Sequence, residues 1–353
     1  MKIAFVSTGS LIDFFPPKQG AIESLEHELI IQLQKRKHQI QLFASFPKMH
    51  NSVSLGTLFI QNHRLHNFYS MINAHLKAKQ LDADIVHAHY PLTALPFLGK
   101  KPLIYTEHNW YNISGMNFHS TPFTPIFNYA QNKVYSKSDK IIALCTEMKQ
   151  NLLQQKIPQE KIELIPNFVN SVEFSSQKKK PNSILFIGRL EKEKRLDLLL
   201  KALEGKKDYS LTIAGAGSQK NNLMKLADSL NINANFLGFV GRKKAIDLFA
   251  SHSIFVLPSD FEVMSLAVLE AMSSECAVIA SNTFGTQEQI VSEKNGLIFE
   301  KGNQNQLSKN LELLLSDEKL ASKLGKNARQ KVLKEFDSKI VAGKIEKVYE
   351  SVL

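Results

Sequence analysis

Short apolar runs alternate with helical patterns along most of this chain. In the first half, the apolar runs of strand length are 2–7, 39–44, 84–88, 102–106, 139–144 and 162–165. Helical periodicity fills several of the intervals between them, as in Ile22–Lys35 and Phe68–Gln80. Because strands separated by helices are typical of parallel βαβ units, this half predicts a doubly wound parallel sheet.

The alternation stops once and then resumes. The stretch Ser175–Ser183 is polar and basic and contains a proline, which predicts an exposed loop just past a domain boundary. The later strand-length runs are Ile184–Ile187, Leu211–Ala214, Asn235–Leu237, Ile254–Leu257, Val278–Ala280 and Gly296–Phe299. From about Gln304 the periodic Leu, Ile and Val residues predict helices. The pattern therefore predicts an α/β protein of two Rossmann-like domains, whose strand carboxyl ends face a central cleft where ligands bind.

The amino-acid composition is consistent with this predicted fold and narrows the classes of partner that we expect. The chain has 353 residues, enough for two domains, and an ordinary globular mixture of 22% charged and 43% hydrophobic residues. Its net charge of +11 is spread over both halves and suits an anionic substrate, an anionic membrane surface or nucleic acid. No recognisable nucleic-acid motif accompanies the charge, so nucleic acid is not an expected partner.

Cysteine usage and hydropathy indicate the cellular compartment. Cys145 and Cys276 lie far apart in apolar settings, which argues against a disulfide scaffold or a metal site. A reducing cytoplasm is the expected location. No stretch approaches the ~20 apolar residues of a membrane span, so membrane contact, if any, is expected to be peripheral, at the inner face.

Two carboxylates, Glu262 and Glu270, flank the start of a predicted helix. Glu262 follows the apolar run Ile254–Pro258 and falls on a loop, whereas Glu270 falls inside the helical run Leu266–Met272. A helix N-terminus offers unpaired N–H groups and a partial positive charge, which suit phosphate. Carboxylates repel phosphate but accept hydrogen bonds from sugar hydroxyls. The arrangement suggests a nucleotide-sugar site, although an exposed loop acid and a helix-face acid would give the same spacing.

Two cations follow a strand at the start of the second predicted domain. Arg189 comes after the apolar run that ends at Ile187, and Lys194 lies just before a helix. Fixed positive charge in this position would neutralise a diphosphate leaving group. The alternative is a solvent-facing surface, because Glu191 and Glu193 interleave with the cations.

Further candidates lie near the predicted strand ends of the first half. Gly20 and Ala21 precede a helix and could lay backbone N–H groups against a phosphate, but without three spaced glycines they form no dinucleotide fingerprint. His87, His89 and His108 end two successive predicted strands, which places them toward the expected cleft. A zinc site is the rival interpretation, but no acidic residue or cysteine stands at ligand spacing.

In their order along the chain, these motifs resemble the retaining, metal-independent glycosyltransferases of family 4, which have the GT-B fold. The resemblance runs nearly from end to end. It includes Gly20–Glu23, Asp84–His89, Thr106–His108, Ile165–Asn167, Gly188–Leu190 with Lys194, Ala214–Gly217, Phe236–Gly238, Pro258-Ser259, Glu270–Met272, Val278–Ser281 and Asn295–Leu297. It implies an acceptor-side domain of 1–166 plus about 336–353, with the last helix crossing back, and a nucleotide-sugar-binding domain of 167–335.

The resemblance implies how the donor nucleotide is held. Arg189 and Lys194 would bind the donor diphosphate and stabilise its charge during catalysis. Gly20 and Ala21 would approach the phosphate from the first domain. Glu270 would accept hydrogen bonds from the ribose hydroxyls.

The resemblance also implies where the transferred sugar lies. Glu262 would contact the sugar, helped by the backbone N–H groups of Met264, Ser265 and Leu266. His108 would lie beside the sugar near the reacting carbon, so Glu262 and His108 complete the implied catalytic set. In the favoured family mechanism the acceptor attacks from the leaving-group side and the departing phosphate takes its proton, so no protein nucleophile is required.

The implied function is retaining transfer of a hexose-type sugar from a nucleotide-diphosphate donor, expected to be UDP-linked, to a glycan or lipid-linked acceptor in cell-envelope synthesis. The nucleotide-sugar is a substrate, and the resemblance implies neither a cofactor nor a metal. The aromatic segment Asn109–Phe127 and the basic first half suit an anionic or lipid acceptor. Two alternatives stay open: a nucleotide-sugar 2-epimerase of the same fold, and a non-catalytic sugar-nucleotide-binding subunit of a glycosylation complex.

The chain departs from the family pattern at several positions. The family usually has glycine where Ala21, Ser265 and Glu275 stand, and two glycines where Phe284-Gly285 stands. Glu275 replaces a helix-ending glycine, so we expect it to alter a turn and not the chemistry. Phe284 is expected to change the local backbone near the cleft.

Overall fold

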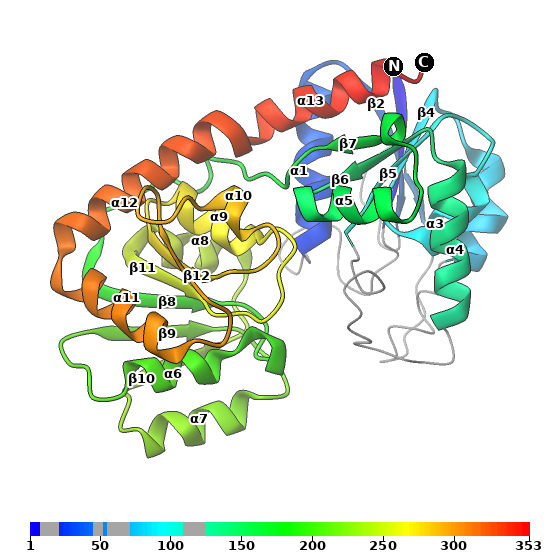
Figure 1. Ribbon diagram of the computed structural model, residues 1–353. Coiled ribbons are helices and arrows are strands. Elements are labelled where there is room, and N and C mark those ends of the chain that lie inside the picture. The colour runs from blue at the N-terminus through cyan, green and yellow to red at the C-terminus, as the bar shows by residue number, and fades with distance from the viewer. Residues whose placement is uncertain (8–20, 45–51, 55–70, 109–123) are drawn as a thin grey trace. The chain divides into compact units, whose positions relative to one another are not determined.

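The chain folds into two compact units. A computed structural model describes residues 1–7, 21–44, 52–54, 71–108 and 124–353 (Figure 1). The first unit comprises Met1–Pro166 and Val341–Leu353, and the second comprises Asn167–Ile340. Residues 336–340 therefore belong to the second unit, whereas we expected the return to the first to begin near 336.

The first unit is built on a seven-stranded parallel sheet with the strand order β3-β2-β1-β4-β5-β6-β7. Its strands are β1 Lys2–Val6, β2 Gln39–Ala44, β3 Ser52–Ser54, β4 Ile85–Ala88, β5 Leu103–Thr106, β6 Lys140–Ala143 and β7 Ile162–Leu164. The central strands β4 and β5 are buried at every position, as expected for parallel strands covered on both faces. Only β3 was not predicted, because a Ser-Val-Ser segment is too short and polar to show a strand pattern.

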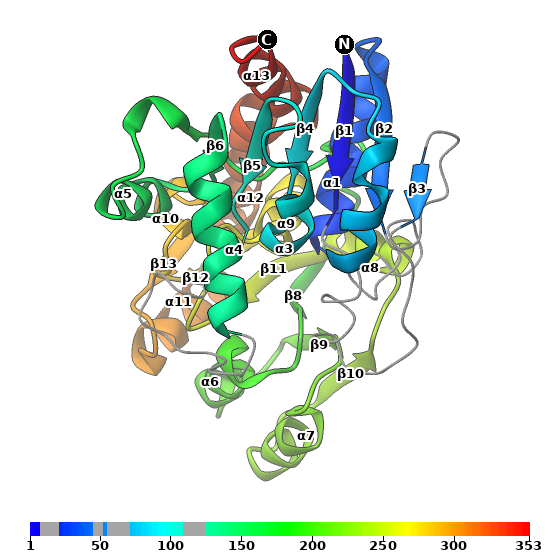
Figure 2. The ribbon, with the colours of Figure 1, turned by 90° about the vertical axis from the view of Figure 1, so that its right-hand side faces the viewer.

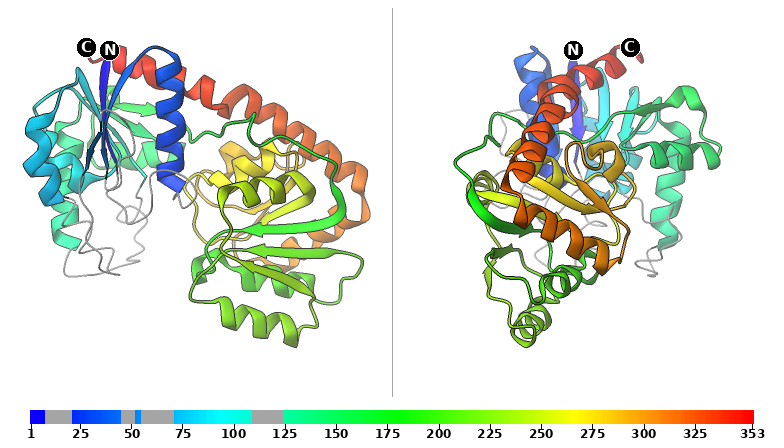
Figure 3. Two further views of the ribbon diagram at one scale, coloured as in Figure 1. Left: turned by 180° about the vertical axis from the view of Figure 1, so that it is seen from behind. Right: turned by 60° about the vertical axis from the view of Figure 1, so that its left-hand side comes forward.

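Helices cover both faces of this sheet. They are α1 Ala21–Lys35, the helical residues 71–77, α3 Pro91–Ala94, α4 Thr124–Lys137 and α5 Thr146–Gln154, with 3₁₀ turns η1 Ala78–Gln80, η2 Leu95–Phe97 and η3 Gln159–Lys161. α3 packs against α4 on the face seen in Figure 2, and α1 lies on the opposite face in the left view of Figure 3.

The last helix, α13 (Ser338–Glu350), ends in the first unit. Its Glu346 accepts a hydrogen bond from Arg36 at 2.9 Å and lies 2.6 Å from the His38 ring. Tyr349, also on α13, is fully buried against His87 of β4. The helix therefore completes the core of a unit that is otherwise formed by the first part of the chain.

The second unit has a six-stranded parallel sheet with the order β10-β9-β8-β11-β12-β13. Its strands are β8 Lys180–Ile187, β9 Ser210–Ala214, β10 Ala234–Gly238, β11 His252–Leu257, β12 Ala277–Ser281 and β13 Leu297–Phe299. The loop expected over Ser175–Ser183 is thus wrong in its second half. Lys180 pairs with His252 of β11, so the sheet continues into this polar stretch.

Helices again lie on both faces of the sheet (Figures 1 and 3). They are α6 Leu196–Leu203, α7 Lys220–Ser229, α8 Arg242–Ser251, α9 Leu266–Ser273, α10 Thr286–Gln289, α11 Gln304–Ser316 and α12 Glu318–Lys331, with a 3₁₀ turn η4 Lys192–Lys194 and a π turn η5 Val332–Phe336. α6 contacts α7 and α11 on one face, and α9 contacts α8 and α12 on the other.

Two features of the chain bear on its environment. Cys145 and Cys276 are both buried, and neither forms a disulfide. Among the described segments, no helix combines the length and the apolar character that crossing a membrane requires.

Candidate functional site

The loops after β8 and β11 meet at the carboxyl edge of the second sheet. Lys194 Nζ donates to Glu262 Oε1 at 2.6 Å, and the Ser259 hydroxyl donates to the same oxygen at 2.8 Å. The side chains of Lys194 and Glu262 are only 16% and 15% exposed. Lys194 and Glu262, which the sequence analysis singled out separately, therefore form one largely buried ion pair.

A second ion pair, between Arg195 and Asp260, joins the same two loops. Arg195 Nη1 donates to both carboxylate oxygens of Asp260, at 3.0 and 3.2 Å, and the Asp260 N–H donates to the Glu193 carbonyl at 2.8 Å. These contacts join the residues on either side of Lys194 to Asp260, and so hold the Lys194 loop against the loop that carries Glu262. Sequence reasoning missed this pair, because an arginine beside several other charged residues has no distinguishing pattern.

Arg189 has a different environment from Lys194. It follows β8 as predicted, but its side chain is 65% exposed and pairs with Glu193 at 2.8 Å. An exposed pair of this kind contributes little to stability and rearranges easily. Arg189 is therefore an exposed surface cation, whereas Lys194 is largely buried.

At the start of α9, the groups available to a ligand are backbone N–H groups and not side chains. Ser265 is the N-cap residue, and its hydroxyl accepts from the Val268 N–H at 3.5 Å. The Met264 side chain is buried, with its sulfur accepting from the Asn167 N–H at 3.1 Å. Leu266 is the first helical residue. A ligand at this end of α9 would therefore meet backbone N–H groups.

Glu270 lies on α9, as predicted, within a separate charged cluster. Arg242 Nη1 of α8 lies 3.9 Å from Glu270 Oε1, while the same guanidinium donates to both oxygens of Glu173, at 2.9 and 2.5 Å. Burial raises the pKa of Glu270 to about 7, an effect that Arg242 opposes and Glu173 reinforces. Neither Arg242 nor Glu173 was predicted to belong to this site.

Gly285 and Phe284 lie beside the Glu262 loop. A side-chain carbon at Gly285 would lie 1.8 Å from the Val263 carbonyl oxygen, so only glycine fits there. Phe284 packs edge-on against Phe261, with the ring centroids 5.5 Å apart. One of the two family glycines is thus required by close backbone packing, and the other position accommodates an aromatic ring.

The first unit contributes its own candidates. His108 follows β5, and its Nε2 lies 3.0 Å from His89 Nδ1. His87 is fully buried, with its ring nitrogens 2.7 Å from the hydroxyls of Tyr349 and Thr106, so it has a structural role in the core. Ala21 is the exposed first residue of α1, and Gly20 lies outside the described residues, as does most of Asn109–Phe127.

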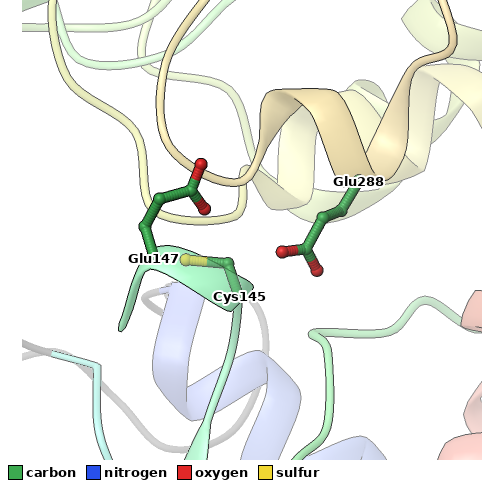
Figure 4. A group of neighbouring side chains, drawn as sticks. All are labelled: Cys145, Glu147 and Glu288. Carbon is green, nitrogen blue, oxygen red and sulfur yellow. The ribbon is translucent and has the colours of Figure 1, made fainter. Parts of the chain in front are cut away.

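Two other features are separate from this site. A cavity of about 400 Å³ is lined by Lys180, Thr212, Lys244 and His252, among others, at the start of β8, the opposite edge of the sheet from Arg189. Figure 4 labels Cys145 and Glu147 at the start of α5 and Glu288 on α10. These three residues belong to different units, and we base no metal site on them.

Two family models match the chain in succession. Glycosyltransferase Family 4 matches residues 22–173, and Glycosyl transferases group 1 matches residues 170–331.

Curated proteins of several bacteria are similar to the chain. An uncharacterized glycosyltransferase of Haemophilus influenzae is 33% identical over 54% of this chain and 56% of its own length. An alpha-1,4-N-acetyl-D-galactosaminyltransferase of Campylobacter jejuni, whose name gives a PP-undecaprenol-linked glycan, is 26% identical over 86% of this chain and 87% of its own.

Solved structures share the fold. Sucrose-phosphate synthase from Thermosynechococcus elongatus is 18% identical and covers 99% of this chain and 98% of its own, with a TM-score of 0.84. HepE of Anabaena in complex with UDP-glucose is 17% identical and covers 99% of this chain and 100% of its own, with a TM-score of 0.80.

Proposed function

We propose that this chain, which belongs to the family 4 and group 1 glycosyltransferases, moves a hexose-type sugar from a UDP-sugar to a glycan or lipid-linked acceptor, with retention of configuration. The expected GT-B fold is confirmed by the two parallel α/β units and by the likeness to solved structures. That the chain is a glycosyltransferase follows from its family, whereas donor, acceptor and stereochemistry are our proposal.

The contact between Lys194 and Glu262 carries the proposal. Its two groups are the ones that a nucleotide-sugar requires: a cation for the diphosphate and a carboxylate for sugar hydroxyls. When a donor binds, Lys194 would turn from Glu262 to the diphosphate, and the released Glu262 would accept from the sugar. A pair that is 2.6 Å long and largely buried supports this proposal, because little movement would then be needed for both groups to reach a bound donor.

The remaining donor contacts follow from the same edge of the sheet. Arg189, free to leave Glu193, would bind the diphosphate from the exposed side, and the backbone N–H groups at the start of α9 would add fixed positive dipoles. Glu270 would accept from the ribose hydroxyls. Because these groups would neutralise the charge of the diphosphate, we also propose that the reaction requires no metal.

The reaction needs no protein nucleophile. The bond between the sugar anomeric carbon and the diphosphate oxygen breaks while the acceptor hydroxyl oxygen bonds to the same face of that carbon. The acceptor proton passes to the departing phosphate oxygen. Lys194 and Arg189 would stabilise the negative charge that develops on the diphosphate, which is the main contribution expected of the protein.

Named relatives support the choice of substrates. The structure of HepE contains UDP-glucose, which supports a UDP-linked hexose as donor. The name of the Campylobacter jejuni relative contains a PP-undecaprenol-linked glycan, which supports a lipid-linked acceptor of the cell envelope.

A screen of nucleotide-sugars tests this function. UDP-, GDP- and ADP-linked hexoses are incubated with the protein, and the loss of donor is followed by mass spectrometry. We expect slow hydrolysis of a UDP-hexose and a lower rate in Glu262→Gln, which keeps the size of the side chain. If the native protein neither consumes nor binds any of these donors, the proposal is overturned. An isomeric nucleotide-sugar as product would instead indicate an epimerase.

A further inference from the structure

The cavity of about 400 Å³ in the second unit lies between α8 and the strands β9 and β10. From α8 it is lined by Lys244, Asp247, Leu248 and Ser251, whose spacing of three and four residues places them on one face of the helix. α8 also packs against β8 and β11. The volume is typical of small-molecule sites, which measure about 300–1,000 Å³.

The sheet face that lines this cavity is polar. Thr212 of β9 turns toward α8, since its hydroxyl oxygen lies 3.0 Å from His252 Nε2 and His252 Nδ1 lies 2.8 Å from the Leu248 carbonyl oxygen. Thr212 pairs with Asn235 of β10, so Asn235 lies on the same face, and the alternation of side chains adds Asn233. Parallel strands that only pack against a helix are apolar on that face, so this polarity indicates contact with water or with a polar ligand.

Four polar side chains of the lining have no protein partner. Lys180, Lys244, Asn233 and Asn235 are exposed, and within the described residues none of their side chains makes a hydrogen bond or an ion pair. Asp247 is the only acidic residue among the described residues of the lining, and it pairs with neither lysine. The cavity therefore presents two cations and two amide groups to a ligand.

The electrostatic potential of the cavity is positive. Burial lowers the pKa of His252, and Lys180, Lys179 and Lys244 add to this effect, against an opposing hydrogen bond to a backbone carbonyl. Lys179 Nζ already donates to the Phe249 carbonyl oxygen at 2.8 Å. Lys180 and Lys244 are thus the cations left to bind an anion beside His252.

We propose that this cavity binds a phosphorylated monosaccharide, with Lys180 and Lys244 holding the phosphate and the amides of Asn233 and Asn235 bonding to sugar hydroxyls. Lysine binds phosphate as a point charge, and two lysines match the double charge of a phosphate monoester. An amide group both donates and accepts hydrogen bonds, as a hydroxyl does. Inorganic phosphate alone would leave most of the cavity unfilled.

This cavity is a second site, apart from the edge that carries Arg189. β8 runs from Lys180, which lines the cavity, to Ile187, two residues before Arg189. A ligand held at the start of β8 would therefore leave Arg189 and Lys194 available to a nucleotide. The inference does not rest on the proposed donor.

Calorimetric titration of the full-length protein tests the class of ligand. The probes are glucose 1-phosphate, glucose 6-phosphate and galactose 1-phosphate, with inorganic phosphate and glucose as controls. We expect at least one hexose phosphate to bind about tenfold or more tightly than either control, because it uses both the lysines and the amides. The proposal fails if none of the three does so.

Lysine substitutions test where the hexose phosphate binds. Lys180→Ala and Lys244→Ala should each weaken its binding by about tenfold. Lys243→Ala is the matched control, because Lys243 is exposed on α8 and does not line the cavity. Lys194→Ala should also leave the affinity unchanged. Weaker binding in Lys194→Ala, with native affinity in Lys180→Ala and Lys244→Ala, would place the ligand at the other edge and overturn the proposal.

Asn235→Leu tests the contact with the sugar, because leucine has a similar size but no hydrogen-bonding group. The variant, checked for folding by circular dichroism, should bind the hexose phosphate about tenfold more weakly and inorganic phosphate as the native protein does. Native affinity for the hexose phosphate would contradict a sugar bound against β10.

Discussion

Lys194 donates a hydrogen bond to Glu262 in the absence of a nucleotide. When a nucleotide binds, Lys194 would exchange this carboxylate for the diphosphate. Replacing Lys194 by Ala removes a hydrogen bond to a charged group, which should weaken UDP binding by about 1.5–3 kcal/mol. Isothermal titration calorimetry measures the change. Lys192→Ala is the matched control, because Lys192 is exposed in the same 3₁₀ turn. Equal affinities of the native protein and Lys194→Ala would contradict the role of Lys194.

The raised pKa of Glu270 makes donor binding depend on pH. Ribose hydroxyls donate to the carboxylate, so binding favours the ionised form. Because the pKa of free Glu270 is about 7, the group is mostly protonated at pH 6 and mostly ionised at pH 8. Affinity for UDP-glucose should therefore tighten about tenfold over this range. Glu270→Gln should abolish the pH dependence, and a flat profile in the native protein would refute the assignment.

At the scale of elements, α9 ends in a strained turn. Glu275 has φ +61°, in the left-handed region where glycine is favoured, and the Cys276 N–H donates to the Ala271 carbonyl at 2.9 Å, as in a Schellman motif. This confirms that Glu275 takes the position of a helix-ending glycine.

Glu275→Gly should stabilise the protein by about 1 kcal/mol, because glycine adopts this conformation without strain. Loss of the distant contact with Arg329, at 3.8 Å, should offset little of the gain. Urea unfolding measures the difference. Glu312→Gly, within α11, is the control and should destabilise by a similar amount. Destabilisation by Glu275→Gly would show that the turn is not strained.

Most strands could be predicted from the sequence, because buried parallel strands are continuous apolar runs. The errors have physical causes. β8 starts early because pairing with β11 overrides the polar character of Lys180 and its neighbours. The loop and helix positions of Glu262 and Glu270 were also correct. The pair Arg195–Asp260 and the contact of Arg242 with Glu270 were not predicted, because these contacts join segments far apart in the sequence and leave no local pattern.

At the scale of the whole molecule, the net charge of +11 favours contact with an anionic surface. We expect the protein to bind vesicles that contain anionic lipid at low salt and to be released as salt increases, because the attraction between exposed charges is screened. Neutral vesicles are the control. Co-sedimentation measures binding, and absence of binding to anionic vesicles at low salt would contradict peripheral membrane contact.

The central claim is that the second unit binds the diphosphate of a sugar nucleotide through Lys194 and its neighbours without a metal. Calorimetric titration with UDP, GDP and ADP, in the presence of a chelator, tests this most directly. We predict binding of UDP with a dissociation constant in the micromolar range, which corresponds to a binding free energy on the order of −8 kcal/mol. Failure of all three nucleotides to bind, or binding of UDP only after a divalent metal is added, would contradict it.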